Sequence, residues 1–256
     1  MENSLLVGLS RQVVLARELE VVANNIANLN TNGFKADESI FQEYIMPVAR
    51  QNHFPGAADR QLSHVIDVGT WRNMGQGAVE RTGNPLDVAI DGNAFLTVQT
   101  PNGVRYTRNG SLKISPTGQL VTSDGYQVQG ENGAITFQQT DHDISIAPDG
   151  RITVIEGANN RTETTRGRLA MVTFAQPQQL QKDGNNNFVA PAGVAANPAT
   201  NVRLMQGYVE KSNVSGVVEM SRLIEITRSY AEVANLLQQQ GDLHKTAIQQ
   251  LAEIPT

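Results

Sequence analysis

The chain's two helical patterns stand at its opposite ends, and this placement limits the possible folds more than any other feature of the 256 residues. Residues 4–30 repeat apolar side chains at spacings of three and four, with Gln12 as the break in the pattern. Residues 213–250 show a similar repeat. We predict one amphipathic helix in each segment, with seams typical of coiled-coil packing. The N-terminal seam contains Leu5, Leu9, Ala16, Leu19, Ala23 and Ile26, and the C-terminal seam contains Leu223, Ile226, Tyr230, Val233 and Leu237.

The expected ends of these helices follow from the residues that flank them. Asn32-Gly33 should close the first helix, because glycine readily takes the left-handed conformation that ends a helix. Asn213 or Ser215 could cap the start of the second helix with a side-chain oxygen.

The middle of the chain has a different sequence pattern, in which short runs of alternating apolar residues lie between glycine-containing turn dipeptides. Strands at this spacing, joined by tight turns, predict an antiparallel β domain. Clear candidates for strands are 95–98, 104–107, 119–122, 144–146, 152–155 and 169–174. The turn dipeptides are Asp91-Gly92, Asn102-Gly103, Asn109-Gly110, Thr117-Gly118, Asp124-Gly125, Asn132-Gly133 and Asp149-Gly150.

Together these patterns predict an α+β fold in which one helical domain is discontinuous in sequence. Residues 1–34 plus 210–256 should form this coiled-coil-like terminal domain, and residues 81–209 the central antiparallel β-rich domain. Residues 35–80 are expected to connect them as an extended or irregular segment. Within that segment, 34–48 could be extended or part helical, and 51–59 reads as a loop.

The two helical seams are poor in large side chains. Alanines at positions such as Ala16, Ala23 and Ala231 allow close approach but contribute little buried area. Two hypotheses follow. The helices could pair within the chain as an ordinary hairpin, or they could stay weakly ordered in the monomer and become stable when other copies supply the missing apolar surface.

Composition argues against catalysis and against several kinds of ligand. The formal net charge is −5, whereas a general nucleic-acid binder needs a basic surface. The absence of cysteine excludes disulfides, thiol nucleophiles and zinc–thiolate sites. The four histidines are widely separated, and no nucleophile elbow or phosphate loop occurs. We therefore expect no catalytic residues, no cofactor, no metal and no small-molecule substrate.

One pair of carboxylates, Asp87 and Asp91, offers an enzymatic alternative. Asp87 and Asp91 would share one face of a strand, and paired carboxylates can hydrolyse glycosides. Asp91, however, belongs to a turn dipeptide, so a structural role is favoured.

Membrane insertion is not expected. A run of about 18 apolar residues is needed to span a bilayer, and the sequence contains none. The first apolar stretch, 5–9, is short and follows Glu2 rather than a basic region, so we also expect no cleavable signal peptide.

Residues 22–35 form an unusual helix end, reading VANNIANLNTNGFK. Asparagine disfavours helix interiors because its amide competes for backbone groups, so its repeated use suggests contacts with neighbouring chains. This run resembles the N-terminal signature of flagellar axial proteins, the family of rod and hook subunits. The residues of the run that the resemblance assigns to an assembly interface, beside the helical seams, are Asn24, Asn25, Asn28, Asn30, Thr31, Gly33 and Phe34.

The resemblance extends over most of the chain. Residues 82–92 are similar to the family's entry into its β domain, 106–111 to a following hairpin, and 207–214 to the lead into the C-terminal helix. The segments 2–6 and 167–175 point to the proximal-rod branch, with the distal-rod branch as the alternative.

The resemblance implies a structural subunit of the flagellar basal-body rod that polymerises helically through its terminal helices and transmits torque from motor to hook. Its partners would be other rod subunits and the flagellar type III export apparatus, and its location the basal body. A secreted β-rich binding module or adhesin is the alternative from another class, but it would leave the two terminal seams unexplained.

Overall fold

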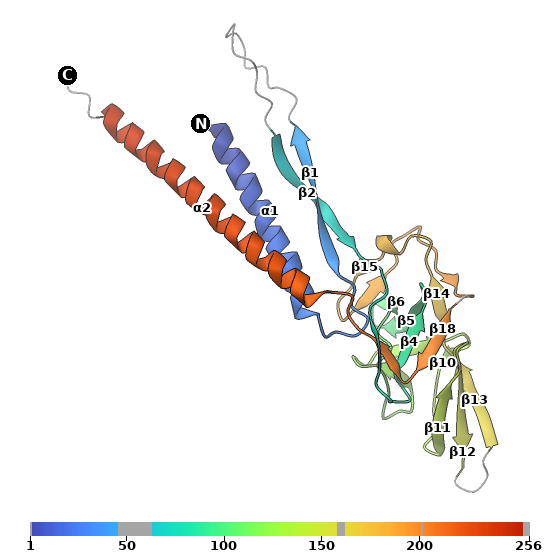
Figure 1. The fold of residues 1–256 in the computed structure, drawn as a ribbon. Coiled ribbons are helices and arrows are strands. Elements are labelled where there is room, and N and C mark those ends of the chain that lie inside the picture. Colours follow the sequence, from blue (N-terminus) through green and yellow to red (C-terminus); the bar gives the residue numbers. More distant parts are fainter. Residues whose placement is uncertain (1, 46–62, 158–161, 201, 253–256) are drawn as a thin grey trace. The chain divides into compact units, whose positions relative to one another are not determined.

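The structure, a computed structural model, describes residues 2–45, 63–157, 162–200 and 202–252 (Figure 1). The chain divides into two compact units. The first, which we call the helical unit, comprises Met1–Ala27, Asp37–Trp71 and Ser215–Thr256. The second, the β unit, comprises Asn28–Ala36 and Arg72–Val214. Each unit therefore draws on segments that are distant in sequence.

The helical unit contains two long helices and one pair of strands. Helix α1 spans Glu2–Ala27 and helix α2 spans Gly216–Ala252. Strands β1 (Asp37–Ile45) and β2 (Ser63–Arg72) pair as a two-stranded sheet. Residues 37–45 are thus extended, which resolves the choice that the sequence left open for them. The expected loop at 51–59 lies outside the described residues.

The β unit is built around one ten-stranded antiparallel sheet. Its main path runs β15-β16-β6-β5-β9-β8-β7, with β10 on β9, and β14 pairing with both β5 and β17. The strands are β5 (Phe95–Thr100), β6 (Gly103–Thr107), β7 (Leu112–Ile114), β8 (Leu120–Thr122), β9 (Gln127–Gly130), β10 (Gly133–Ala134), β14 (Met171–Thr173), β15 (Gln181–Lys182), β16 (Asn187–Val189) and β17 (Asn197–Pro198).

Three smaller sheets complete the β unit. One has three strands, β11 (Asp141–Ile146), β12 (Arg151–Glu156) and β13 (Thr162–Arg168). The second pairs β4 (Val88–Asp91) with β18 (Arg203–Gln206), and the third pairs β3 (Val79–Arg81) with β19 (Tyr208–Glu210). A short 3-10 helix covers Pro177–Gln179.

The turn dipeptides explain why these strands form where they do. Strands β5 and β6 pair in a register that closes at Thr100↔Gly103, around the Asn102-Gly103 turn. Six of the seven predicted turn glycines have positive φ, a conformation that glycine adopts without steric cost. The seventh, Gly110, differs: a Cβ there would lie 1.7 Å from the Val88 carbonyl oxygen, so close backbone approach explains this glycine. The predicted α+β architecture, with helices flanking an antiparallel β-rich middle, is confirmed.

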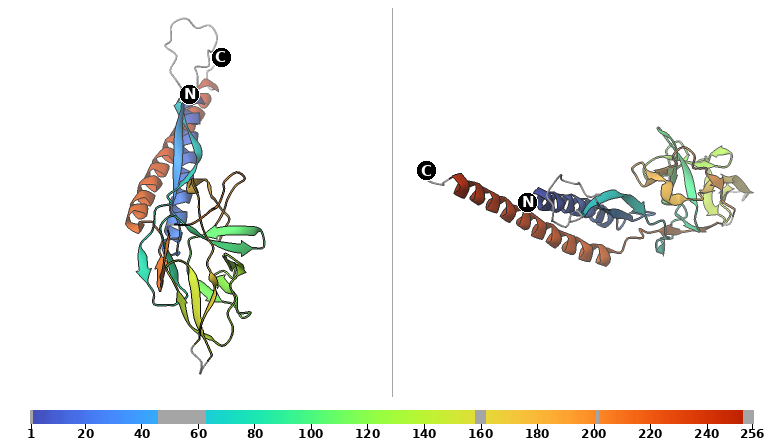
Figure 2. Two further views of the ribbon diagram at one scale, coloured as in Figure 1. Left: turned by 90° about the vertical axis from the view of Figure 1, so that its right-hand side faces the viewer. Right: turned by 90° about the horizontal axis from the view of Figure 1, so that it is seen from above.

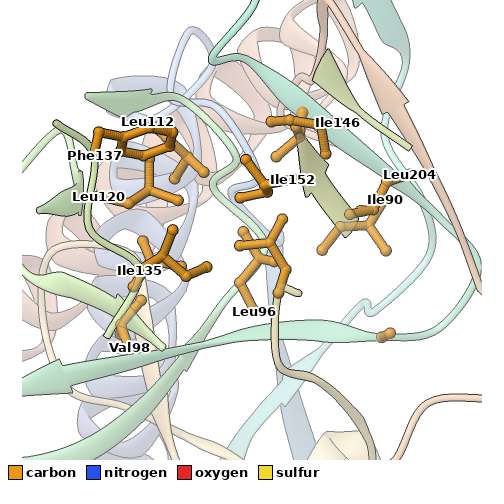
Figure 3. Close-up of a cluster of buried hydrophobic side chains, with 14 of the residues drawn as sticks. Ile90, Leu96, Val98, Leu112, Leu120, Ile135, Phe137, Ile146, Ile152 and Leu204 are labelled. Carbon is orange, nitrogen blue, oxygen red and sulfur yellow. The ribbon is translucent and has the colours of Figure 1, made fainter. Parts of the chain in front are cut away.

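The core of the β unit is aliphatic. Ile90, Leu96, Leu120 and Ile152 are fully buried, and their side chains point toward one another (Figure 3). Leu204 from β18 joins the same cluster although it lies far along the chain. The core therefore packs the main sheet against the sheets of β4–β18 and β11–β13.

The end of α1 differs from the prediction. The helix stops at Ala27, before the expected Asn32-Gly33 boundary. The Asn28 side-chain oxygen accepts a hydrogen bond from the Thr31 hydroxyl, and its carbonyl accepts one from the Thr31 backbone, so the chain enters a turn. Asparagine here closes the turn through its own amide instead of continuing the helix. Gly33 does have positive φ, but it lies within the following segment.

Candidate assembly site

The two helices pack against each other within the chain, as the hairpin hypothesis expects (Figure 2). Leu15 and Val22 of α1 and Ile226 of α2 are buried in one cluster. Half-buried apolar residues surround them: Leu19, Ile26, Leu223, Tyr230 and Val233. The contact is lean, because its cluster contains three buried side chains among the described residues. Whether it keeps the helices ordered in a dilute monomer stays a prediction.

The face of α1 that meets α2 is rotated from the predicted seam. Leu19 and Ile26 belong to both, but the contact runs through Leu15 and Val22 in place of Ala16 and Ala23. Leu9 and Ala23 are instead exposed. Two apolar stripes overlap on α1, and the one with larger side chains packs within the chain because it buries more area. Leu5 is helical, but its side chain is outside what the structure describes.

Two residues adapt the helices to this contact. Gln12, which interrupts the predicted seam, reaches across and donates a hydrogen bond to the Tyr230 hydroxyl at 3.1 Å. Gly8 lies directly under Leu237, where a Cβ would come within 2.7 Å of a methyl carbon. A polar bridge and a close approach thus replace larger apolar contacts.

The helical pairing leaves aliphatic side chains exposed on the other faces. On α1, Leu9 and Val13 are 54% and 61% exposed. On α2, Val217, Met220 and Ile224 are also strongly exposed. Contiguous exposed apolar surface is uncommon in monomeric proteins and marks interaction sites. We call Leu9 and Val13 the α1 outer face, and Val217, Met220 and Ile224 the α2 outer face.

An apolar groove of about 450 Å³ opens between the far ends of the helices. Val7 and Gly8 of α1 form one wall, and Leu236, Leu237 and Leu243 of α2 form the other. Leu236 and Leu243 remain mostly exposed. The groove is thus a further apolar surface, beside the two outer faces, that no described residue of the chain covers.

The asparagines at the end of α1 have different environments. Asn25 is buried; its amide bonds both backbone groups of Asp37 and lies 3.3 Å from the Glu219 carboxylate of α2. Its hydrogen-bonding groups are therefore used within the chain, fixing α1 to β1 and α2. Asn24 and Asn30 are exposed, whereas Asn28 is half-buried.

Residues 28–36 belong to the β unit and are anchored there by main-chain contacts. The Gly33 backbone nitrogen donates to the Glu210 carbonyl at 2.7 Å. A Cβ on Gly33 would lie 2.5 Å from the Arg108 carbonyl carbon, so only glycine fits. Phe34 is buried, and the Lys182 amino group lies 4.1 Å from its ring centre. Gly33 and Phe34 thus hold the segment after α1 on the β unit, whereas Thr31 bonds Asn28 and Phe34 within the segment itself.

The strongest polar feature of the β unit is a buried ionic cluster centred on Glu210. Its carboxylate lies 2.5 Å from the Lys35 amino group, and accepts two hydrogen bonds from Arg108 and one from the Gly77 backbone. The side-chain exposures of Glu210, Lys35 and Arg108 are 0%, 1% and 4%. We call these three side chains the Glu210 cluster. One carboxylate thus balances two cations, leaving an excess positive charge inside the protein.

Backbone carbonyls stabilise the two buried cations by accepting hydrogen bonds from them. Lys35 donates to the Gly75 carbonyl at 2.7 Å, and Arg108 donates to the carbonyls of Gly92 and Ala94. Burial lowers the pKa of the Lys35 amino group below its usual 10.5; Glu210 opposes this shift and Arg108 adds to it. The sequence reasoning missed this cluster, although Lys35 and Glu210 both stand within the segments that carry the family resemblance.

The two carboxylates considered as a catalytic pair differ in their environments. Asp87 is buried and accepts a hydrogen bond from Asn84, whereas Asp91 is exposed. Within the described residues, no group of three or more His, Asp or Glu could hold a metal ion. No helix in the described part of the chain is long and apolar enough to cross a membrane.

Comparison with known proteins agrees with the fold at both ends and in the middle. Family models match residues 5–35 (flagella basal body rod protein), 89–154 (flagellar hook protein FlgE/F/G D1 domain) and 205–250 (flagellar basal body rod FlgEFG protein C-terminal). These are the first helix with its asparagine-rich end, the core strands, and the lead into the second helix.

Relatives of similar length match nearly the whole chain. The flagellar basal-body rod protein FlgF of Caulobacter vibrioides is 36% identical over 99% of this chain and 100% of its own length. FlgF of Mesorhizobium japonicum is 30% identical over 98% of both chains. The rod protein FlgG of Bacillus subtilis is 31% identical over 93% of this chain and 94% of its own.

Fold and comparisons together define a structural protein of the bacterial flagellum. More narrowly, the chain belongs to the family of flagellar basal-body rod proteins. It is therefore a structural rod subunit of the basal body that assembles with other rod or hook components, as the resemblance predicted. The alternative of an adhesin finds no support.

Removing the central carboxylate should test the Glu210 cluster. Glu210→Gln leaves Lys35 and Arg108 buried without a counter-charge, so we expect the free energy of unfolding of the β unit to fall by about 3–5 kcal/mol. Denaturant unfolding followed by circular dichroism measures this. The control is Glu80→Gln, an exposed carboxylate 3.7 Å from Lys211, which should change stability by less than about 1 kcal/mol. Equal effects of the two substitutions would contradict the conclusion that Glu210 stabilises the β unit by neutralising Lys35 and Arg108.

The lowered pKa of Lys35 predicts a specific pH dependence. In the alkaline range the unfolded chain binds more protons at this position than the folded chain, so folding becomes more favourable as pH rises toward 10.5. Lys35→Met does not titrate there. We expect the stability of the wild type relative to Lys35→Met to increase between neutral pH and 10.5, measured by denaturant unfolding at each pH. A difference that stays constant or declines would show that burial does not depress this pKa.

Proposed function

We propose that this rod subunit polymerises helically through its terminal helices and thereby transmits torque from the motor to the hook. The observation that supports this most directly is the exposure of aliphatic side chains on both helices after the helices have paired. Burial of such side chains between copies would be favourable by about 25 cal/mol per Å² of apolar surface.

Two groups stand out among the residues of the assembly interface proposed from the sequence. Leu9, Ala23, Asn24 and Asn30 are exposed. Leu19, Ile26, Leu223, Ile226, Tyr230 and Val233 instead hold the two helices together. We infer that the second group builds a paired helical element and that the first group presents it to other subunits. Asn25 would support the paired element from within the helical unit, and Gly33 and Phe34 would hold the following segment on the β unit.

The terminal helical domain would act as one body in the assembled rod. We propose residues 1–34 and 210–256 as this domain, residues 35–80 as the connection, and residues 81–209 as the outer β-rich domain. Coiled-coil packing of the helices belongs to this proposal, supported by their spacing of three and four. The ionic contacts of Lys35 and Glu210 would bind the ends of the terminal segments to the β-rich domain.

We further propose that the protein is not an enzyme and that its partners are proteins alone. Export through the flagellar type III apparatus fits a chain without cysteine. The net charge of −5 offers little attraction for nucleic acid, and neither a cofactor nor a small-molecule substrate is required for a structural role.

The α1 outer face should be essential for assembly but not for folding. We expect Leu9→Gln combined with Val13→Gln to reduce swimming at least tenfold, because these side chains make contacts only between subunits. Exposed substitutions of this kind change stability by about 0.5 kcal/mol or less. The matched control is Val104→Gln, which is 44% exposed on the β unit. Swimming halos and counts of isolated basal bodies provide the measurement; unchanged swimming would argue against assembly through this face.

Within the rod we propose the proximal position, with the distal rod as the alternative. The segments 2–6 and 167–175 favour the proximal branch of the family. Labelled copies should therefore be found at the end of isolated basal bodies that lies nearer the motor, visible by electron microscopy with a gold-tagged chain. Labels concentrated next to the hook would favour the distal assignment.

A further inference from the structure

We propose that the apolar groove receives the α2 outer face of a second copy of this chain. This inference rests on the proposed function and extends it by naming two faces that meet. It predicts a head-to-tail contact in which the start of α2 in one copy lies against the far end of the helical pair in the next.

The α2 outer face is a convex apolar ridge. Val217, Met220 and Ile224 are 81%, 57% and 71% exposed. They follow one another at three and four residues, so they lie on one side of the helix. Val217 is nine residues from Ile226, which the 3.6-residue repeat places on opposite sides of α2. The ridge therefore points away from α1 and cannot be covered by the helical pairing.

The groove supplies the complementary concave surface. Its walls come from both helices, with Val7 on α1 facing Leu236 and Leu243 on α2. Its volume is about 450 Å³. The α1 outer face is a weaker acceptor because Leu9 and Val13 stand out from a single helix. A ridge against a ridge buries less surface than a ridge in a groove.

The spacing of the side chains fits one register. Val217 and Ile224 are seven residues apart, as are Leu236 and Leu243. If Val217 meets Leu236, then Ile224 meets Leu243, because both pairs differ by 19 positions. At 1.5 Å per residue, adjacent copies would be displaced along α2 by about 28 Å.

The same geometry excludes a contact within one chain. Ile224 and Leu243 lie on one helix, about 28 Å apart along its axis, so the ridge cannot fold back into its own groove. The contact also joins two different surfaces, so it is heterologous. Heterologous contacts that do not close into a ring generate helical filaments, which is the assembly that a rod requires.

Disulfide trapping tests the contact directly, because the natural chain contains no cysteine. The variant Ile224→Cys/Leu243→Cys cannot form a disulfide within one chain, since the two Cα atoms of a disulfide lie within about 7 Å. We expect mild oxidation of isolated basal bodies to convert most of the protein into a ladder of covalent multimers on a non-reducing gel. The control variant Val13→Cys/Ile224→Cys, which probes the α1 outer face, should give at most one tenth of that product.

The outcomes separate this inference from the proposed function. If the protein is present in basal bodies and cells swim, but the ladder is missing or arises from the control instead, the groove contact is wrong and the structural role stands. If the protein is absent from basal bodies even without substitutions, the proposed function itself fails.

A pair of opposite charges tests the same contact if the cysteine variants fail to assemble. Ile224→Lys and Leu243→Glu should each reduce swimming at least tenfold, because each buries an unpaired charge. The two together should restore at least half of the wild-type swimming rate. Absence of any restoration by the double variant would overturn the contact.

Discussion

The β unit depends on one buried carboxylate. Glu210 neutralises part of the charge on Lys35 and Arg108, and its own backbone oxygen holds Gly33. These residues come from the segment after α1, the middle of the β sheet and the segment before α2. Burying three ionised groups is expensive unless each is paired and hydrogen-bonded, and here the backbone carbonyls around Lys35 and Arg108 complete the pairing. The ends of the β unit's chain are thereby fixed to its core.

The helical unit differs from the β unit, because few of its apolar side chains are buried and many are exposed. Its pairing uses a small cluster around Val22 and Ile226, while aliphatic residues such as Val13 and Ile224 remain in solvent. Such surfaces lower the solubility of a monomer, and they become an advantage only when copies meet. Membership of the rod family explains why a protein would keep such exposed apolar side chains, since rod proteins assemble with other subunits. Under the proposed function, these exposed side chains would be buried against other subunits.

Local features of this protein could be predicted from the sequence, whereas long-range ones could not. The turns at Asn102-Gly103 and Asp124-Gly125 depend on the backbone preferences of adjacent residues, so the strands predicted at 104–107 and 119–122 correspond to β6 and β8, whereas the short strand β7 between them was not predicted. The contact of α1 with α2 runs through Leu15 and Val22, one position before Ala16 and Ala23 of the predicted seam. The sequence could not specify this, because two apolar stripes overlap on α1 and only the partner helix decides between them. The Glu210 cluster was missed because its members lie up to 175 positions apart. A charged residue within an otherwise apolar or glycine-rich motif was the one available signal.

The two segments that connect the β unit to the helices also have a mechanical consequence. Gly33 bonds to Glu210, and Asn213 bonds to Phe34 and, through its side chain, to Ala36, so both segments advance in the same direction as they pair. One segment continues from the C-terminus of α1 and the other leads to the N-terminus of α2. Tension applied in opposite directions at residues 28 and 214, which are the opposite ends of this parallel pair, would load these bonds in shear and at the same time. Bonds arranged in this way share the load, whereas bonds in a hairpin peel apart one after another.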